Sequence, residues 1–88
     1  MKKEELKKLM DSAGDAVISY KSEKSKKTKY NICTLDFSTP YIQKKNNRVK
    51  EDDNTLLMFC WDTDSYRLMK PENVVSVVPL ASILKNER

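Results

Sequence analysis

The segment that most constrains the fold of this chain is its most apolar run, Leu56-Leu57-Met58-Phe59-Cys60-Trp61. A run of this length falls far short of the roughly 20 apolar residues that a membrane-spanning helix needs. Because no polar residues alternate within it, the run is typical of a strand buried on both faces. We therefore predict a central β-strand here, in a protein without a membrane segment.

Four more segments carry the β-branched and aromatic residues that are typical of strands. We expect these strands at Ala16–Lys21, at Thr28 to about Phe37, at Tyr66–Lys70 and at Val74–Val78. A charged turn, Ser22–Lys27, separates the first two. Together with the apolar run they make a set of short strands of the kind that curls into a small barrel.

The second strand changes phase along its length. Tyr30 and Ile32 fall on one face, whereas the other face takes Cys33, Leu35 and Phe37. Such a shift predicts a β-bulge or a strong bend, as small barrels need.

Residues 39–43 and 44–55 connect this strand to the apolar run. We expect residues 39–43 to continue the second strand or to form a short strand of their own. Pro40 places that strand at an edge, because proline cannot donate a ladder hydrogen bond. The segment 44–55 is the most polar in the chain, and we predict a long, mobile hairpin loop there.

The N-terminal residues 2–13 have the pattern of a short amphipathic helix that ends at Gly14. Its apolar stripe consists of Leu6, Leu9, Met10 and Ala13. A helix this short is unstable alone, so we expect it to pack on the sheet as a lid. A partner-binding or dimerising helix is the alternative.

These elements predict a single domain over residues 1–88, mainly β with an N-terminal helix and so of the α+β class. We expect a helix at 2–13, a small five-stranded antiparallel barrel of SH3 or Sm-like type over about 16–80, and a short C-terminal tail at 81–88. The tail begins with one helical turn, residues 80–84.

The residue types present argue against catalysis. The chain has no histidine, which removes the usual general base near neutral pH and the commonest metal ligand. Its single glycine argues against a phosphate-binding loop. Asp62 and Asp64 lack the further oxygen ligands of a calcium loop, so a solvated turn is the simpler reading. We predict no enzymatic activity, no metal and no cofactor.

The two cysteines, Cys33 and Cys60, both lie in apolar runs. We expect buried, reduced thiols, with a disulfide between facing strands as the alternative. The charged N-terminus, Met1-Lys2-Lys3-Glu4-Glu5, is not followed by an apolar segment. It therefore does not read as a signal peptide, and we predict a cytoplasmic protein.

Three sequence patterns, which span about Ala16 to Leu80, resemble the WYL domain, a small Sm-like β-barrel of bacterial regulators. Ile18-Ser19-Tyr20-Lys21-Ser22 is similar to the opening strand of that family, and Cys60-Trp61-Asp62 to a strand that ends in an acidic turn. The closing pattern of the family is matched by Ser65-Tyr66-Arg67-Leu68 followed by Asn73-Val74-Val75-Ser76-Val77.

The resemblance is partial. The Trp-Tyr-Leu trio is absent where Leu56-Leu57-Met58 stands, and the second arginine of the family has no counterpart near Glu72 or Asn73. The helix-turn-helix that commonly precedes the domain is also missing. The resemblance implies a regulatory protein with a nucleic-acid ligand, and it marks Arg67 as a ligand-contacting residue.

Basic residues gather in two clusters, at the first hairpin and in the long loop. With a net charge of +4, the chain suits a polyanionic partner. If both loops lie along one groove, lysines can follow a phosphate backbone while tyrosines stack on bases. The tyrosines that interleave with the clusters are Tyr20, Tyr30, Tyr41 and Tyr66. We predict binding of single-stranded nucleic acid through Lys24, Lys26, Lys27, Lys29, Lys44, Lys45, Arg48, Arg67 and Tyr20.

Each of these features also has a simpler interpretation. Lysines in loops often only maintain solubility, and Arg67 could simply pair with Asp62 or Asp64. The alternative function is a protein-interaction module, either a homodimer or homo-oligomer, or a phage-type accessory protein that docks on a larger host complex. Its surfaces would be the N-terminal helix and the strand Val74–Val78.

Overall fold

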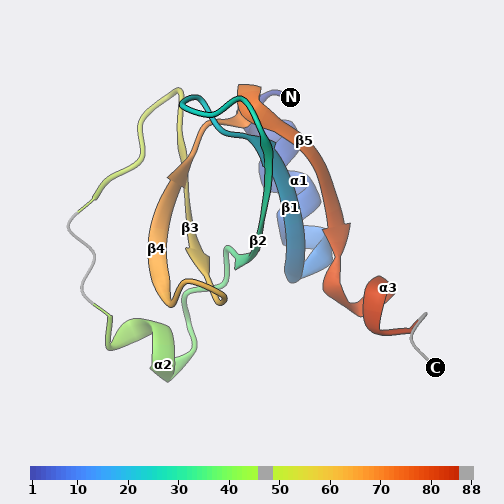
Figure 1. The fold of residues 1–88 in the computed structure, drawn as a ribbon. Coiled ribbons are helices and arrows are strands. Elements are labelled where there is room, and N and C mark those ends of the chain that lie inside the picture. The colour runs from blue at the N-terminus through green and yellow to red at the C-terminus, as the bar shows by residue number, and fades with distance from the viewer. Residues whose placement is uncertain (46–48, 86–88) are drawn as a thin grey trace.

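The computed structural model describes residues 1–45 and 49–85, and it has one antiparallel sheet with flanking helices (Figure 1). The elements follow in the order α1 (Lys3–Ala13), β1 (Asp15–Lys21), β2 (Thr28–Thr34), α2 (Pro40–Gln43), β3 (Leu56–Cys60), β4 (Ser65–Met69), the 3-10 helix η1 (Pro71–Asn73), β5 (Val74–Pro79) and α3 (Leu80–Lys85). The predicted α+β class with an N-terminal helix is confirmed.

The five strands lie in the order β4-β3-β2-β1-β5. Four strands therefore form a consecutive meander, and β5 returns to pair with β1. The β1–β2 ladder runs without interruption from Asp15–Thr34 to Lys21–Thr28. The β2–β3 ladder holds only the pairs Cys33–Cys60 and Thr34–Phe59, so this boundary, hereafter the seam, is the narrowest in the sheet.

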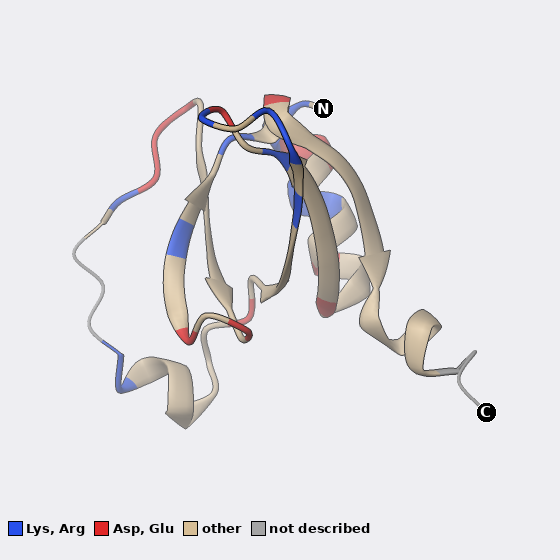
Figure 2. Ribbon diagram, viewed as in Figure 1, with Lys and Arg blue, Asp and Glu red and all other residues tan. Residues whose placement is uncertain are grey.

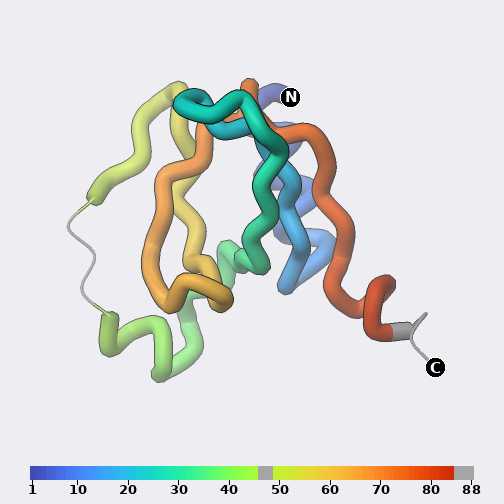
Figure 3. Tube along the Cα trace, in the orientation of Figure 1, coloured from blue at the N-terminus to red at the C-terminus, as the bar shows by residue number. Residues whose placement is uncertain are grey.

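The sheet is strongly curved, so that β4 comes to face β1. In a flat sheet, strands three positions apart would be separated by about 14 Å. Instead, the Arg67 guanidinium carbon on β4 lies 4.9 Å from the ring centroid of Tyr20 on β1. The tube in Figure 3 follows this curl, with the β1–β2 turn and the end of β4 at the same end of the molecule. Among the described residues, the edge strands β4 and β5 share no ladder.

Helix α1 covers the concave side of the sheet, against β5 and β1. Leu6 and Met10 are fully buried, whereas Leu9 is 42% exposed, so the buried stripe is narrower than predicted. Gly14 ends the helix with a φ of +74° and donates its N–H to the carbonyl of Met10. The strand residues of the same core are Ala16, Ile18, Tyr20, Cys33, Leu56, Met58, Cys60, Met69 and Val74.

The prediction of a strand at residues 39–43 is wrong, because this segment forms α2. Pro40 occupies the first turn of the helix, where its missing N–H costs nothing. The Thr39 hydroxyl caps the helix by accepting a hydrogen bond from the N–H of Ile42, at 3.4 Å. Ile42 is fully buried, which fixes the helix against the sheet.

The second strand, expected to run to about Phe37, ends at Thr34, and the predicted bulge in it is wrong, since its ladder with β1 is regular. The Thr34 hydroxyl accepts the N–H of Asp36, and the Asp36 carboxylate accepts the N–H of Ser38, each at 3.1 Å. These local bonds turn the chain out of the sheet. The register shift of the sheet lies instead between β1 and β5, at Ser19 and Tyr20.

The prediction that the apolar run is buried on both faces is confirmed for β3. Met58 faces the core beneath α1, and Phe59 is fully buried on the opposite face. There the Phe59 ring packs edge-on against Trp61 at 5.2 Å and against Tyr66 at 5.4 Å between centroids. We call this set the aromatic cluster, which comprises Phe37, Tyr41, Phe59, Trp61 and Tyr66.

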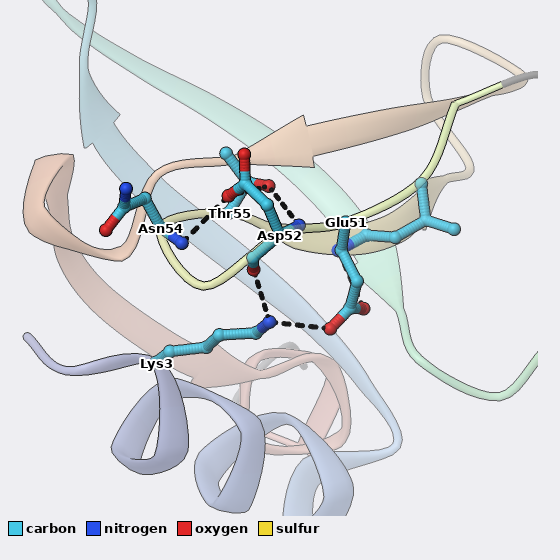
Figure 4. A network of polar contacts seen from close by, with 6 residues as sticks. Lys3, Glu51, Asp52, Asn54 and Thr55 are labelled. Atoms are coloured by element: carbon cyan, nitrogen blue, oxygen red, sulfur yellow. Dashed lines mark hydrogen bonds and ion pairs between the residues drawn. The ribbon is translucent and has the colours of Figure 1, made fainter.

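Residues 49–55, part of the predicted hairpin loop, connect α2 to β3 and are tied to α1 (Figure 4). Lys3 forms an ion pair with Glu51 at 2.8 Å and donates to the carbonyl of Asp52 at 2.6 Å. The Asp52 carboxylate in turn accepts the N–H of Asn54 at 2.8 Å. These contacts place the start of β3 next to the N-terminus of α1.

The packing of α1 leads to a first prediction. Leu6→Ala should lower the free energy of unfolding by about 2–5 kcal/mol, because it leaves a cavity in the core. Leu9→Ala on the same helix is the matched control, and it should change stability by no more than about 0.5 kcal/mol. Urea denaturation followed by circular dichroism measures both values. Equal effects of the two changes would contradict this orientation of α1.

Candidate functional site

A basic pocket of about 340 Å³ opens where the β1–β2 turn meets the end of β4. Its charged lining residues come from β1, from the turn, from the start of β2 and from β4 with the residue that follows it. Figure 2 shows blue Lys and Arg segments at this end of the molecule. The charged residues of the basic pocket are Lys21, Glu23, Lys24, Lys29, Arg67 and Lys70.

Arg67 and Tyr20, which are in contact, both line the basic pocket. Alternation along β4 places Arg67 on the concave side of the sheet, opposite Met58 of β3. Its guanidinium group lies over the buried Tyr20 ring, which is a cation–π contact. Among the described residues Arg67 forms no ion pair, so its planar set of donors is available to a ligand.

A chain of hydrogen bonds, buried at the Tyr20 end and exposed at Asp62, holds Tyr20 in place. The Tyr20 hydroxyl donates to Asn31 Oδ1 at 2.5 Å, and Asn31 Nδ2 donates to Asp62 Oδ2 at 2.8 Å. The other oxygen of Asp62 accepts the N–H of Ile32 at 3.2 Å. Burial raises the pKa of Tyr20 above its ordinary value, and the positive charge of Arg67 opposes that rise. The ring is therefore a fixed, neutral platform for the arginine.

Glu23 joins the two walls of the basic pocket. Its carboxylate accepts a hydrogen bond from Lys70 Nζ at 2.7 Å and another from Asn73 Nδ2 at 3.2 Å. Both hydrogen bonds lower the pKa of Glu23, and the bond from Lys70 has the larger effect. The turn itself is closed by a bond from the Lys26 N–H to the Ser22 carbonyl at 2.8 Å, with Lys26 at a φ of +59°. The β1–β2 turn is thus fastened to the end of β4.

The charge balance of the basic pocket favours an anionic ligand. Five basic residues and one acidic residue line it. A neighbouring pocket of about 500 Å³ has no such excess of positive charge, since three acidic residues line it together with Met1, Lys3 and Lys70. Its acidic residues are Asp52, Asp53 and Glu72. The smaller pocket is therefore the site that suits phosphate groups.

The structure brings together four of the nine predicted site residues. Tyr20, Lys24, Lys29 and Arg67 all line the basic pocket. Lys26 and Lys27 lie in the same turn and are exposed, but they do not line the pocket.

The second lysine cluster does not join this site. Lys44 and Lys45 follow α2 at the opposite end of the molecule (Figure 2). Lys45 forms an ion pair with Asp64 at 2.9 Å and lies 4.9 Å from the centroid of the Tyr41 ring. Arg48 lies outside the described residues. Lys44 and Lys45 therefore do not share a groove with the lysines of the first hairpin, and this part of the prediction is wrong.

The tyrosines divide between different surfaces. Tyr41 and Tyr66 belong to the aromatic cluster, on the face of the sheet away from the basic pocket. Tyr30 is 66% exposed on β2. Tyr20 is the member of the predicted set that lines the pocket.

The simpler reading of Arg67, as a partner of Asp62 or Asp64, is wrong. Asp62 bonds to Asn31 and Ile32, and Asp64 accepts hydrogen bonds from Tyr41 at 2.5 Å and from Lys45 at 2.9 Å. Both hydrogen bonds lower the pKa of Asp64, and the bond from Tyr41 has the larger effect. Both carboxylates are therefore engaged elsewhere in the structure.

Sequence reasoning missed Lys70, Glu23 and Asn73 as parts of the site. These residues are up to 50 positions apart in the chain. Only the curl of the sheet brings the end of β4 next to the β1–β2 turn. The sequence offers only a weak signal for these residues, namely that Glu23 and Lys70 are charged and lie just after a strand. Exposed strand ends are commonly charged, so this signal does not indicate a site.

Comparisons of this chain with protein-family models, with curated proteins and with solved structures found no match. The resemblance to the WYL domain therefore stays a prediction. In residues 1–45 and 49–85, no helix is long and apolar enough to cross a membrane. The same residues contain no group of three or more acidic or cysteine side chains placed to hold a metal ion.

The buried tyrosine leads to a second prediction, at alkaline pH. The pKa of Tyr20 is raised in the folded state above its ordinary value of 10.0. As the pH rises through about 10, the unfolded chain loses this proton before the folded protein does, so stability falls. Tyr20→Phe should therefore show a smaller loss of unfolding free energy between about pH 9 and pH 11 than the wild type.

The matched control is Tyr30→Phe, which alters an exposed ring. It should retain the alkaline loss of the wild type. At neutral pH, Tyr20→Phe should be less stable by about 1 kcal/mol, because the bond to Asn31 is lost. Urea denaturation across the pH range measures all three proteins, and identical pH slopes would refute the role of Tyr20.

Proposed function

We propose that this protein is a small, non-catalytic regulatory module that binds single-stranded nucleic acid in the basic pocket. The observation that supports this best is Arg67, which is stacked on Tyr20 and lies in a pocket also lined by Lys21, Lys24 and Lys29. A fixed guanidinium group presents paired donors that suit a phosphate or a base edge. The lysines around it supply the charge that attracts a polyanion.

A single strand suits this site better than a duplex. The volume of about 340 Å³ falls within the range of ligand pockets and suits a single nucleotide unit. Lys26 and Lys27 continue the positive charge outward along the turn. A flexible strand can place one unit in the pocket and lay its next phosphates along these lysines.

We also propose that the curved sheet is a small barrel of the SH3 or Sm-like type. The four-stranded meander, the return of β5 to β1 and the contact between β4 and β1 support this assignment. Arg67, which the WYL resemblance marks as ligand-contacting, lines the basic pocket. That agreement between pattern and position supports a WYL-like function.

The third prediction is a salt-dependent affinity for short oligonucleotides. Fluorescence anisotropy with a labelled single-stranded DNA or RNA should show binding at low salt. A plot of the logarithm of the association constant against the logarithm of the salt concentration should have a slope of about −2 to −3. This is the slope expected for about three or four phosphate contacts with a single strand. The double variant Lys29→Ala, Arg67→Ala should weaken binding at least tenfold and reduce the slope by about 1.4.

The double variant Lys7→Ala, Lys8→Ala is the matched control, because it removes the same charge from helix α1. It should retain most of the affinity. Absence of binding at low salt would refute the proposed function. Equal losses in the two double variants would show that net charge alone, rather than the basic pocket, holds the ligand.

A protein-interaction module is the second candidate, and the edge strand β5 favours it. Val75 is 56% exposed and Val78 is 39% exposed on this strand. Strand β5 pairs with β1 on one side only among the described residues. An apolar edge strand can add to a sheet of a second copy or of a larger host complex.

The fourth prediction tests this candidate through the oligomeric state. If β5 mediates self-association, light scattering should give a dimer mass at high concentration for the wild type. Val75→Lys should then return the protein to a monomer, because it places a charge on the exposed edge. Leu9→Lys, which adds the same charge to the exposed side of α1, is the control and should leave the dimer intact. A wild type that stays monomeric would count against self-association.

A further inference from the structure

Cys33 and Cys60 face each other directly across the seam. They are one of its two residue pairs, and both side chains are fully buried with free thiols. Their sulfur atoms lie 2.9 Å apart, in the core beneath α1. Two thiols this close on adjacent strands are placed for a covalent reaction with each other.

The ladder around the two cysteines is suited to a cross-strand bond. The N–H of Trp61 donates to the carbonyl of Ile32 at 2.7 Å, so that neighbouring pair is the hydrogen-bonded one. Cys33 and Cys60 therefore occupy a non-hydrogen-bonded position, where Cα atoms are about 4.5 Å apart. That spacing lies within the range of roughly 4.4–6.8 Å seen for disulfides. The pairing of the two strands therefore allows a bridge at this position.

We propose that Cys33 and Cys60 are a thiol–disulfide site, and that an organic disulfide of the glutathione type oxidises them to an intramolecular bond across the seam. In the first step, one cysteine thiolate attacks the small disulfide. Its sulfur–sulfur bond breaks, a mixed disulfide forms and one small thiol leaves. The second cysteine then attacks the mixed disulfide and releases the other small thiol. Two electrons pass from the protein to the reagent, and the two cysteine protons end on the released thiols.

The surroundings of the two sulfurs indicate which one reacts first. A hydrogen bond to Cys60, together with burial, raises the pKa of Cys33. The hydrogen bond between the two thiols lowers the pKa of Cys60. Cys60 is also the last residue of β3, next to the β3–β4 turn, where local opening costs least. Because it lies at this strand end, Cys60 is the attacking thiol of the first step and Cys33 the resolving thiol.

Oxidation at this position would fasten the sheet where it is narrowest. The β1–β2 ladder and the β3–β4 ladder are both longer than the two-pair seam between them. A bond from Cys33 to Cys60 would close a chain loop that contains α2 and the polar segment before β3. A cross-link of this kind restricts the unfolded chain and raises the stability of the folded state.

The fifth prediction tests the bond in the full chain, treated with oxidised glutathione with and without urea near the unfolding midpoint. The product should be a monomer lighter by the mass of two hydrogen atoms, and its thiols should not react with iodoacetamide after unfolding. Peptide mapping should show Cys33 joined to Cys60. The melting temperature should rise by about 10 °C or more and return on treatment with dithiothreitol.

Two single variants separate this site from general thiol chemistry. Cys33→Ala should stop at the mixed disulfide on Cys60, and Cys60→Ala should react more slowly than Cys33→Ala. If either variant fails to fold, peptide mapping of the wild type still decides the question. Thiols that stay free after treatment under both conditions would overturn the proposal, as would mixed disulfides or intermolecular dimers as the only wild-type products. This outcome is independent of whether nucleic acid binds in the basic pocket.

Discussion

Met58 and Phe59 are neighbours in β3, point to opposite faces of the sheet and are both fully buried. Burial on two sides requires a layer of structure on each side. Helix α1 and the concave face of the curved sheet enclose Met58. On the other face, the rings of Tyr41, Trp61 and Tyr66 cover Phe59. Most of the remaining elements are therefore placed by the need to remove this one strand from water.

The curl that encloses the core also creates the basic pocket. Arg67 and Tyr20 lie on strands that are separated by two others, yet their side chains are in contact. In a flatter sheet the two side chains would lie too far apart for this cation–π contact. The seam, the narrowest part of the sheet, lies between these two strands. Core packing and pocket geometry thus depend on the same curl of the sheet.

Local patterns predicted the elements whose stability is local. The helix that ends at Gly14, the strand beginning at Leu56 and the turn after Lys21 follow from spacing and composition. Residues 39–43 were predicted wrongly, because β-branched and aromatic content outweighed the capping signal of Thr39 before Pro40. The pocket was predicted only in part, since the pairing of Glu23 with Lys70 depends on the sheet curvature, which no short pattern encodes.

The pairing of β5 with β1 has a consequence for the order of folding. The hydroxyls of Ser19 and Ser76 hydrogen-bond across this ladder although they are 57 positions apart. On the ribosome, β1 and β2 can form a hairpin as soon as both emerge, but the other edge of β1 stays unpaired until β5 emerges. Contacts of such long range close slowly, because the loop entropy is lost before the contacts form. Until then, the nascent chain presents an unpaired apolar edge that is open to capture by chaperones or by its own neighbours.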